Sequence, residues 1–508
     1  MKKKTWQRVL ALSLALIFTL GMLASCGKTE DVVEDGGDRV NGSWDSVDFG
    51  GQVVRFCIST NQYEECTFPA ANIYTKGPDQ AGSNEVAKEV IARNTAAAKD
   101  LGVTIEYSER SLRYPEVHED IRKIVQTSAT NSPDIYNNDL IGLGKAMVDG
   151  LLWNVKNPGD VKNYFDFEAD GWYTEYIKGC TFDQEKLYIF AGDYFIDMIR
   201  MAWVILVNND ILESNLKKMP EWCGSVSEFY EYIDSGMWDL DMLGDMANRV
   251  FVDSGIQGAT ERKDTLVGFS MNHVTNWIIS ASSGITLYYQ DENYAPKVMQ
   301  SIDDYQKVSN KYKALAEKPG VYLPATATVE GVLDSTTHFL EGTVLFAASR
   351  LGEMESTALR DFSANKGITP FPKWNGYEQD EYHTTIHNQV ELGAILSTAR
   401  AYSAASALMQ YLNEESEQVV YTYYEKGLKY KYNDDENARI MMDIIRDTTD
   451  SPFGFEIGDI CQTLYTGSGT LKGLYIKDTD TIRSTFASEK DAYNDCMAKM
   501  IEKFKALE

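Results

Sequence analysis

The sequence predicts an α/β protein of two domains, and three observations carry that prediction. Strand-like and helix-like segments alternate along most of the chain, which is typical of parallel or mixed sheets covered by helices. A nearly continuous apolar run at 201–207 has the character of a strand that is buried on both faces, and a further β run lies at 342–348. The chain has 508 residues, which is too long for a single hydrophobic core.

The first domain opens with a β-rich run at 52–58. Asn84 then begins a helix with apolar residues at helical spacing, which Gly102 ends, and an alternating strand follows at 103–107. Strand, helix and strand in this order predict a right-handed βαβ unit. A second helix at 116–129 leads to a short strand that ends in Asn137, Asn138 and Asp139. Loops after parallel strands line ligand crevices, although Asp139 is also a natural cap for the next helix.

The second half repeats the alternation. After the strand at 201–207, a capping box at Ser225 starts a helix, and a further helix covers about 240–250. We expect strands near 266–269, 285–289 and 342–348, and a long helix over about 296–316. A strand-like run at 391–396 and a helix over 399–412 follow, and the last helix spans about 480–506.

The first 25 residues have the features of a secretory signal peptide. A basic start (Lys2, Lys3, Lys4 and Arg8) precedes an apolar run at 9–20, which is too short to span a membrane. The segment Leu23-Ala24-Ser25-Cys26 resembles a bacterial lipobox, so Cys26 is expected to be the lipid attachment site; the alternative is an ordinary signal with a chance cysteine. Residues 26–47 are acidic and glycine-rich, and we expect a flexible tether.

Charge and composition exclude some partners. The formal net charge is −28, and removal of the four basic residues of the signal takes it to −32. Such a surface repels nucleic acid and anionic lipid head groups. The simpler explanation of this negative charge is a solvated acidic surface. The more specific explanation is a cationic ligand. Six cysteines remain beside Cys26, without CxxC spacing, and their pairing stays open.

The sequence offers no positive support for catalysis. It contains no GxSxG elbow, no P-loop and no GxGxxG motif. His383, His387 and Glu391 are spaced four apart, which on a helix would form a zinc-binding face. Because Thr384, Thr385 and Ile386 favour an extended chain, we expect a strand that brings His387 near a crossover, no metal site and no cofactor.

Aromatic residues stand beside amide and carboxylate groups in several predicted loops and helix starts. Such pairs combine a ring that stacks on the apolar face of a sugar with groups that hydrogen-bond its hydroxyls. Taken singly, an aromatic residue of this kind more often packs in the core, and only the set as a whole favours a ligand site. The pairs occur at Tyr136–Asp139, Asp193 with Tyr194, His273 with Trp277, and Tyr288 with Tyr289.

The order of these segments resembles family 1 of the bacterial extracellular solute-binding proteins, the lipoproteins that deliver sugars to ABC importers. The resemblance covers essentially the whole mature chain. The segments that carry it are Ser132-Pro133-Asp134-Ile135, the stretch from Phe182 to Tyr188, the strand from Trp203 to Leu212, the stretch from Phe339 to Phe346, and Gly367-Ile368-Thr369-Pro370-Phe371-Pro372. The chain departs from the family pattern before Lys186, where the usual glycine is missing, and at Glu221-Trp222-Cys223.

The resemblance implies a type II periplasmic-binding-protein-like fold, with two lobes that close around a ligand by hinge motion. Lobe one would hold 48–205 plus 391–450, and lobe two 206–390 plus 451–508. Tyr194 and Trp277 would stack on the ligand. The expected hydrogen-bonding contacts are Asn61, Asn138, Asp139, His273, Arg350 and His387.

The predicted function is therefore that of a monomeric, lipid-anchored binding protein on the outer face of the cytoplasmic membrane. It would capture a mono- or oligosaccharide and deliver it to ABC permease subunits, without covalent chemistry. The alternatives are a peptide- or polyamine-binding protein, a surface lipoprotein enzyme acting on glycans, and a structural adhesin.

Overall fold

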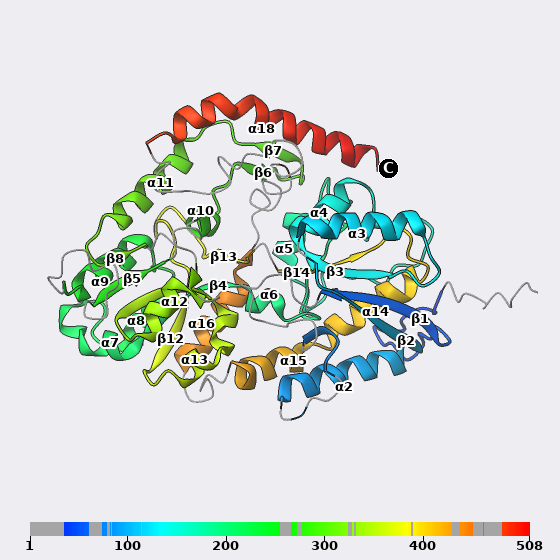
Figure 1. Ribbon diagram of the computed structural model, residues 1–508, viewed down its shortest axis with the longest axis horizontal. Helices are drawn as coiled ribbons and strands as arrows, with labels where there is room; N and C mark the ends of the chain where they lie inside the picture. Colours follow the sequence, from blue (N-terminus) through cyan, green and yellow to red (C-terminus); the bar gives the residue numbers. More distant parts are fainter. Residues whose placement is uncertain are drawn as a thin grey trace, which may run out of the picture.

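Two open sheets organise the computed structural model, which describes residues 35–59, 74–78, 82, 84–112, 114–253, 266–271, 277–323, 328–329, 332–387, 390–428, 436–450, 461 and 480–507. Each sheet lies in its own lobe, and the two lobes stand side by side (Figure 1). No helix in these ranges is both long enough and apolar enough to cross a membrane. The expected signal peptide and Cys26 lie outside the described residues.

The first sheet has four strands in the order β14-β3-β1-β2. β1 pairs in parallel with β2 and β3, while β14 runs antiparallel to β3. Figure 1 shows α3 and α4 on one side of this sheet and α2, α14 and α15 on the other. The predicted βαβ unit is thus confirmed. The strands are β1 (Gln52–Ser59), β2 (Val103–Arg110), β3 (Ile135–Asp139) and β14 (Glu391–Ile395); the helices are α2 (Glu85–Asp100), α3 (Tyr114–Thr127), α4 (Leu140–Val148), α5 (Thr174–Cys180), α14 (Tyr402–Glu414), α15 (Glu417–Thr422) and η5 (Tyr423–Gly427).

The second sheet has five strands in the order β12-β4-β11-β5-β8. β4, which was expected to be buried on both faces, and β11, which was expected only to be a strand, have every residue buried and pair antiparallel at the centre. The strands are β4 (Trp203–Asn208), β5 (Val267–Ser270), β8 (Val321–Tyr322), β11 (Val344–Arg350) and β12 (Lys366–Pro370); the helical segments are α7 (Asn209–Ser214), η2 (Leu216–Lys218), α8 (Val226–Asp234), α9 (Leu240–Val250), α12 (Asp334–Leu340), η4 (Leu351–Glu355), α13 (Thr357–Asp361) and α16 (Glu436–Asp447).

The described chain passes between the sheets through α6 (Asp197–Arg200), through the stretch from β13 (Thr384–Thr385) to β14, and between η5 and α16. β13 pairs in parallel with β15 (Thr449–Asp450). His383 to His387 is therefore extended rather than helical, which excludes the zinc-binding helix face. α16 packs on β12 and α8, so this helix lies with the second sheet, although the expected lobe boundaries placed 391–450 in the first lobe.

An arch of secondary structure lies above the two sheets (Figure 1). The expected helix over 296–316 begins only at Asp303, because Pro296–Val298 form the strand β7 of a hairpin instead. Cys461 and Cys496 form a disulfide within this part of the molecule. The elements are α10 (Trp277–Ser282), β6 (Tyr288–Gln290), β7 (Pro296–Val298), α11 (Asp303–Ala316) and α18 (Ile482–Lys505), with a small hairpin of β9 (Thr328–Val329) and β10 (Val332–Leu333) nearby in sequence.

Candidate functional site

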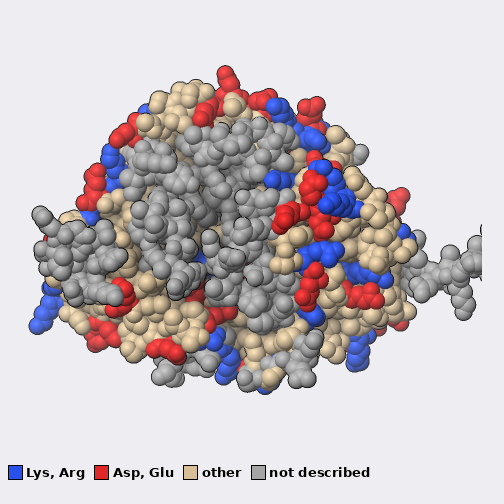
Figure 2. Space-filling model, in the orientation of Figure 1, with Lys and Arg blue, Asp and Glu red and all other residues tan. Residues whose placement is uncertain are grey.

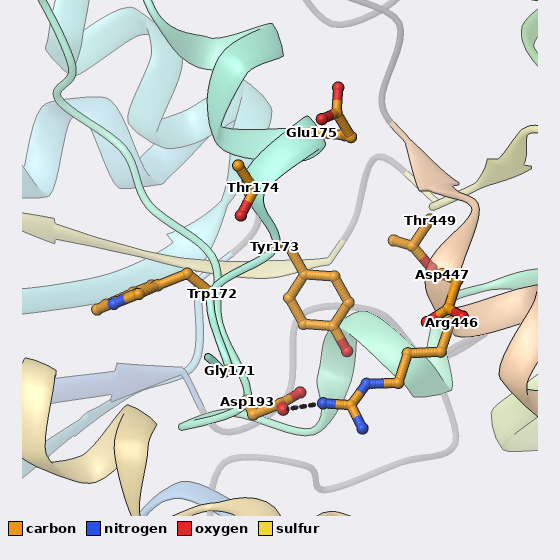
Figure 3. Close-up of a pocket in the computed structure, with 9 residues that line it drawn as sticks. All are labelled: Gly171, Trp172, Tyr173, Thr174, Glu175, Asp193, Arg446, Asp447 and Thr449. Atoms are coloured by element: carbon orange, nitrogen blue, oxygen red, sulfur yellow. Dashed lines mark hydrogen bonds and ion pairs between the residues drawn. The ribbon is translucent and has the colours of Figure 1, made fainter. Parts of the chain in front are cut away.

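A polar pocket of about 220 Å³ lies where elements of the two lobes meet (Figure 3). The first lobe contributes the turn into α5 and the segment after Phe190, which pairs with Gly393 of β14. The second lobe contributes the end of α16 and β15. The lining residues are Gly171, Trp172, Tyr173, Thr174, Glu175, Asp193, Arg446, Asp447 and Thr449.

An ion pair between Asp193 and Arg446 joins the two sides of this pocket. The Asp193 side chain is 2% exposed and that of Arg446 is 36% exposed. Burial raises the pKa of Asp193 to about 6, and the nearby Arg446 guanidinium offsets part of that rise. Burial alone would lower the pKa of Arg446, but the Asp193 carboxylate raises it overall. Near neutral pH both groups are charged, so the pair holds the lobes together electrostatically.

Tyr173 is the aromatic residue that faces the pocket. Its hydroxyl points toward Asp193 and Arg446 in Figure 3, but it makes no hydrogen bond of ordinary geometry with the described residues. Oδ1 of Asp193 likewise makes none with the described parts of the chain. A buried donor and a buried acceptor in this state are costly unless a ligand or water satisfies them. The pocket thus presents hydrogen-bonding capacity that the described protein atoms leave unused.

Trp172, the neighbour of Tyr173, belongs to the core instead. Its indole Nε1 donates to Oε1 of Gln410 at 3.0 Å, and its ring packs edge-on against Phe165 and Phe167. Figure 3 shows the ring directed away from Tyr173. The adjacent aromatic residues therefore have different roles: Trp172 fixes the backbone of this segment in the core, and Tyr173 projects from it into the pocket.

A second cluster, which we call the hinge cluster, lies in the crossovers and consists of Asp197, Arg200, Glu355, Tyr74 and Tyr423. Arg200 is fully buried; its Nε contacts Oε1 of Glu355 at 2.7 Å and its Nη1 contacts Oδ1 of Asp197 at 2.9 Å. The Tyr74 and Tyr423 hydroxyls donate to the Glu355 carboxylate at 3.1 and 2.6 Å. Burial opposes the charge on Arg200, but the carboxylates, with Glu355 first, raise its pKa overall. The hinge cluster is a network of buried ions at the place where the crossovers join the two lobes, which we call the pivot.

The structure buries the predicted contacts of the first sheet. Asn138 and Asp139 are both inaccessible, and Asp139 caps α4 by accepting from the Gly142 N–H at 2.8 Å. The helix-cap interpretation of Asp139 is thus confirmed. Tyr194 is 1% exposed and packs near Phe190. A Cβ at Gly393 would lie 2.6 Å from the Tyr194 hydroxyl oxygen, so only glycine leaves room for this ring. None of these three predicted contacts lines the interlobe pocket.

Two further predicted residues, Arg350 and His387, are each neighbours of Trp203. Arg350 ends β11 opposite Trp203 of β4, and the Trp203 ring lies 5.9 Å from the His387 ring. Arg350 is 5% exposed, and its guanidinium pairs with Oε1 of Glu353 at 3.1 Å. The positive charge of Arg350 is therefore paired with a carboxylate of its own lobe. Asn61, His273 and the side chain of Trp277 lie outside the described residues.

The residues that do form the pocket were only partly visible in the sequence. Asp193 stands in one of the aromatic–carboxylate pairs noted above, beside Tyr194, but it was not among the predicted contacts. Tyr173 lies in a segment rich in aromatic residues, and nothing in the sequence distinguishes it from its neighbours that pack in the core. Arg446 lies in an amphipathic helix and carries no local signal, since only the packing of α16 brings it to Asp193.

No protein-family model matches this sequence, and no curated protein does. Solved structures do share its fold. A solute-binding protein of an ABC transporter from Thermotoga lettingae, bound with α-D-tagatose, is 12% identical over 89% of this chain and 100% of that chain, with a TM-score of 0.50. A cyclic α-maltosyl-1,6-maltose binding protein from Arthrobacter globiformis is 11% identical over 90% and 99%, with a TM-score of 0.52. An uncharacterized protein from Listeria monocytogenes is 11% identical over 90% and 100%, with a TM-score of 0.53. The predicted two-lobed, type II binding-protein-like fold is confirmed.

Proposed function

We propose that this chain is the solute-binding component of an ABC importer and that it captures a mono- or oligosaccharide between its lobes. The observation that carries the proposal is the interlobe pocket, in which Tyr173 and Asp193 from one lobe face Arg446 from the other. Two proteins of the same fold, one bound with α-D-tagatose and the other a cyclic α-maltosyl-1,6-maltose binding protein, support a carbohydrate here.

Each pocket group has a role suited to a sugar. The Asp193 carboxylate accepts from ligand hydroxyls, the Arg446 guanidinium donates to them, and the Tyr173 hydroxyl can do either. The Tyr173 ring supplies an apolar surface for the C–H face of a pyranose. Because these groups come from different lobes, a ligand that contacts all of them binds the closed form better than the open form, and so favours closure.

The remaining parts of the proposal concern location and partners. The N-terminal 25 residues act as a signal peptide, lipid on Cys26 holds the mature chain at the outer face of the cytoplasmic membrane, and the closed form delivers its solute to membrane permease subunits. Lobe one comprises residues from 48 to the first crossover and from 391 to the end of η5. Lobe two comprises the residues between these segments, together with α16.

The carboxylates of the pocket favour a second candidate ligand. Glu175, Asp193 and Asp447 line it, and Arg446 is the one cation among the described lining residues, although Lys178 outside the lining pairs with Glu175. Three carboxylates against one guanidinium attract a positively charged solute such as a polyamine or a basic peptide. Sugar and cation differ in salt dependence, since hydroxyl hydrogen bonds are little affected by ionic strength and charge attraction is screened.

Both candidates are tested by a thermal-shift screen of the mature protein against sugars, oligosaccharides, spermidine and short peptides. A ligand at 100 times its Kd should stabilise the folded protein by roughly 2.7 kcal/mol. We expect a shift with a sugar, and its loss in Asp193→Asn and Tyr173→Phe. The matched control is Glu168→Gln, an exposed first-lobe carboxylate outside the pocket lining. If only spermidine shifts the unfolding midpoint, the ligand is a cation and not a sugar. If no solute shifts it, the proposal is contradicted.

A further inference from the structure

Helix α18 joins the two lobes on the side of the molecule away from the crossovers. It has 24 residues, which corresponds to a length of about 36 Å. In Figure 1 it runs across the top of the molecule, from α11 above the second lobe to α3 and α4 of the first. Its two ends therefore contact different lobes, and each end has its own set of contacts.

The first half of α18 is fastened to the arch elements next to the second lobe. Arg483 pairs with Asp303 of α11 at 2.6 Å, and Nζ of Lys490 donates to the Gln300 carbonyl at 3.1 Å. The Cys461–Cys496 disulfide adds a covalent link in the middle of the helix. This half of the helix therefore moves together with α11.

The last turn of α18 packs on the first lobe. The Phe504 ring, 1% exposed, lies with its centre 4.0 Å from that of Phe182 and 5.9 Å from that of Tyr188. Its carbonyl accepts from Nζ of Lys186 at 3.1 Å. The segment from Phe182 to Tyr188 belongs to the first lobe, because the Val155 N–H donates to the Leu187 carbonyl and Phe190 pairs with Gly393.

The β6–β7 hairpin of the arch also reaches the first lobe, since the Gln290 amide donates to the Thr181 carbonyl and the Asp183 N–H donates to the Tyr294 carbonyl at 3.4 Å. Two further contacts lie at the rim of the α18 interface. Leu507 lies over Gly150, where an added Cβ would come within 2.5 Å of the leucine Cδ2. Nζ of Lys503 lies 3.6 Å from Oδ1 of Asp149, with both side chains partly exposed. Asp149 also contacts His118 at 2.8 Å, so the carboxylate is already held in place by α3 when Lys503 approaches it.

We infer that the end of α18, from Lys503 to Leu507, is a latch that holds the two lobes in the closed arrangement. The inference rests on the proposed function, since it assumes lobes that open about the crossovers. Opening the lobes on the arch side requires Phe504 and Leu507 to leave the first lobe, because the other half of α18 is fixed to the second. The small size of this apolar contact makes it reversible, in contrast to the buried ions at the pivot.

The latch is tested with Phe504→Ala combined with Leu507→Ala, in the full mature chain. The control is Lys499→Ala, whose ion pair with Asp495 lies within α18. Small-angle scattering without added solute should give a larger radius of gyration for the double variant than for the parent and the control. For any solute found in the screen, dissociation should accelerate by about tenfold, the effect expected when one buried aromatic contact is lost.

A second variant keeps the test valid if the double variant folds poorly. Lys503→Glu changes only an exposed side chain and places a carboxylate against Asp149, so it should also enlarge the radius of gyration, and added salt should reverse the change. Parent-like scattering for both variants, with folding intact, would overturn the latch. A larger radius of gyration in the variants, without binding of any solute to the parent, would support the latch and contradict the proposed function. Solute binding by the parent, with an unchanged radius of gyration in the variants, would support the proposed function and contradict the latch.

Discussion

The two junctions between the lobes are built from different chemistry. At the pivot, Arg200 is fully buried and makes ion pairs with Asp197 and Glu355, and tyrosine hydroxyls satisfy the carboxylate further. At the arch, the contacts with the first lobe are the Phe504 ring, the Leu507 side chain, one partly exposed ion pair and a few hydrogen bonds to backbone carbonyls. Buried charges are very costly to separate, whereas a small apolar patch separates at modest cost. We therefore expect the contacts at the pivot to stay intact when the lobes move, and the contacts at the arch to separate and re-form.

The largest expected effect comes from breaking the pivot. Glu355→Ala leaves Arg200 buried with half of its carboxylate partners, and we expect a loss of about 3–5 kcal/mol in the free energy of unfolding, measured by urea denaturation. Glu355→Gln, which keeps the hydrogen-bonding shape, should lose about 1–3 kcal/mol. If Glu355→Ala loses less unfolding free energy than Glu355→Gln, Arg200 has found water or another partner. The pivot would then be as adaptable as the arch.

A smaller effect should follow from pH at the interlobe pocket, which lies between the two junctions. The pKa of Asp193 is about 6 in the folded protein and 3.8 when unperturbed, so the folded state binds this proton more tightly. The contribution of this group to the free energy of unfolding therefore falls as pH rises between these values. Its ion pair with Arg446, in contrast, forms fully only above about pH 6.

Solute affinity is the quantity in which this titration should be visible. We expect weaker binding at about pH 5 than at about pH 7.5, measured by calorimetry, because the protonated carboxyl neither attracts Arg446 nor accepts ligand hydrogen bonds as strongly. Asp193→Asn should bind weakly at both pH values. A parent protein with equal affinity under the two conditions would remove Asp193 from the ligand contacts.

The smallest effect is expected from the exposed ion pairs of the arch. Arg483 and Asp303 are 59% and 63% exposed, and such pairs contribute about 0–1 kcal/mol. Arg483→Ala should lower the midpoint of thermal unfolding by no more than about 4 °C, because 1 kcal/mol shifts this midpoint by about 2–4 °C in large domains. A larger change would mean that the arch, too, depends on charge, and the contrast with the pivot would weaken.

Most of the fold was predictable because burial leaves regular traces in a sequence. β4 was recognised from a nearly continuous apolar run, β11 from its β-rich composition, and the first βαβ unit from the helix start at Asn84 and its stop at Gly102. The prediction was wrong at 296–302, where apolar spacing suggested a helix and Pro296 instead begins a strand. It also placed α16 with the first lobe, since helical periodicity shows which face is buried but not which sheet buries it.

The pocket was less predictable than the fold. Polar residues at a strand end were expected to face a cleft, yet Asn138 and Asp139 are inaccessible, and Asp139 caps a helix. Tyr194 fills a space that Gly393 leaves open, which is a matter of cross-strand packing. Arg446 reaches Asp193 across 253 positions of sequence, and no local pattern marks such a partner. Residues that act across a junction are identified only when both of its sides are known.

The antiparallel edge strand β14 has a consequence for how the protein is made. The first sheet begins at Gln52 but receives β14 only from Glu391–Ile395, and β14 pairs directly with β3. A growing chain that has completed β1, β2 and β3 therefore carries an open sheet edge until the whole second sheet has been synthesised. Exposed strand edges invite pairing with other chains, and such distant pairings form slowly. The first sheet to be started is thus the last to receive all its strands, and the topology leaves the β3 edge in need of protection until Glu391–Ile395 has been synthesised.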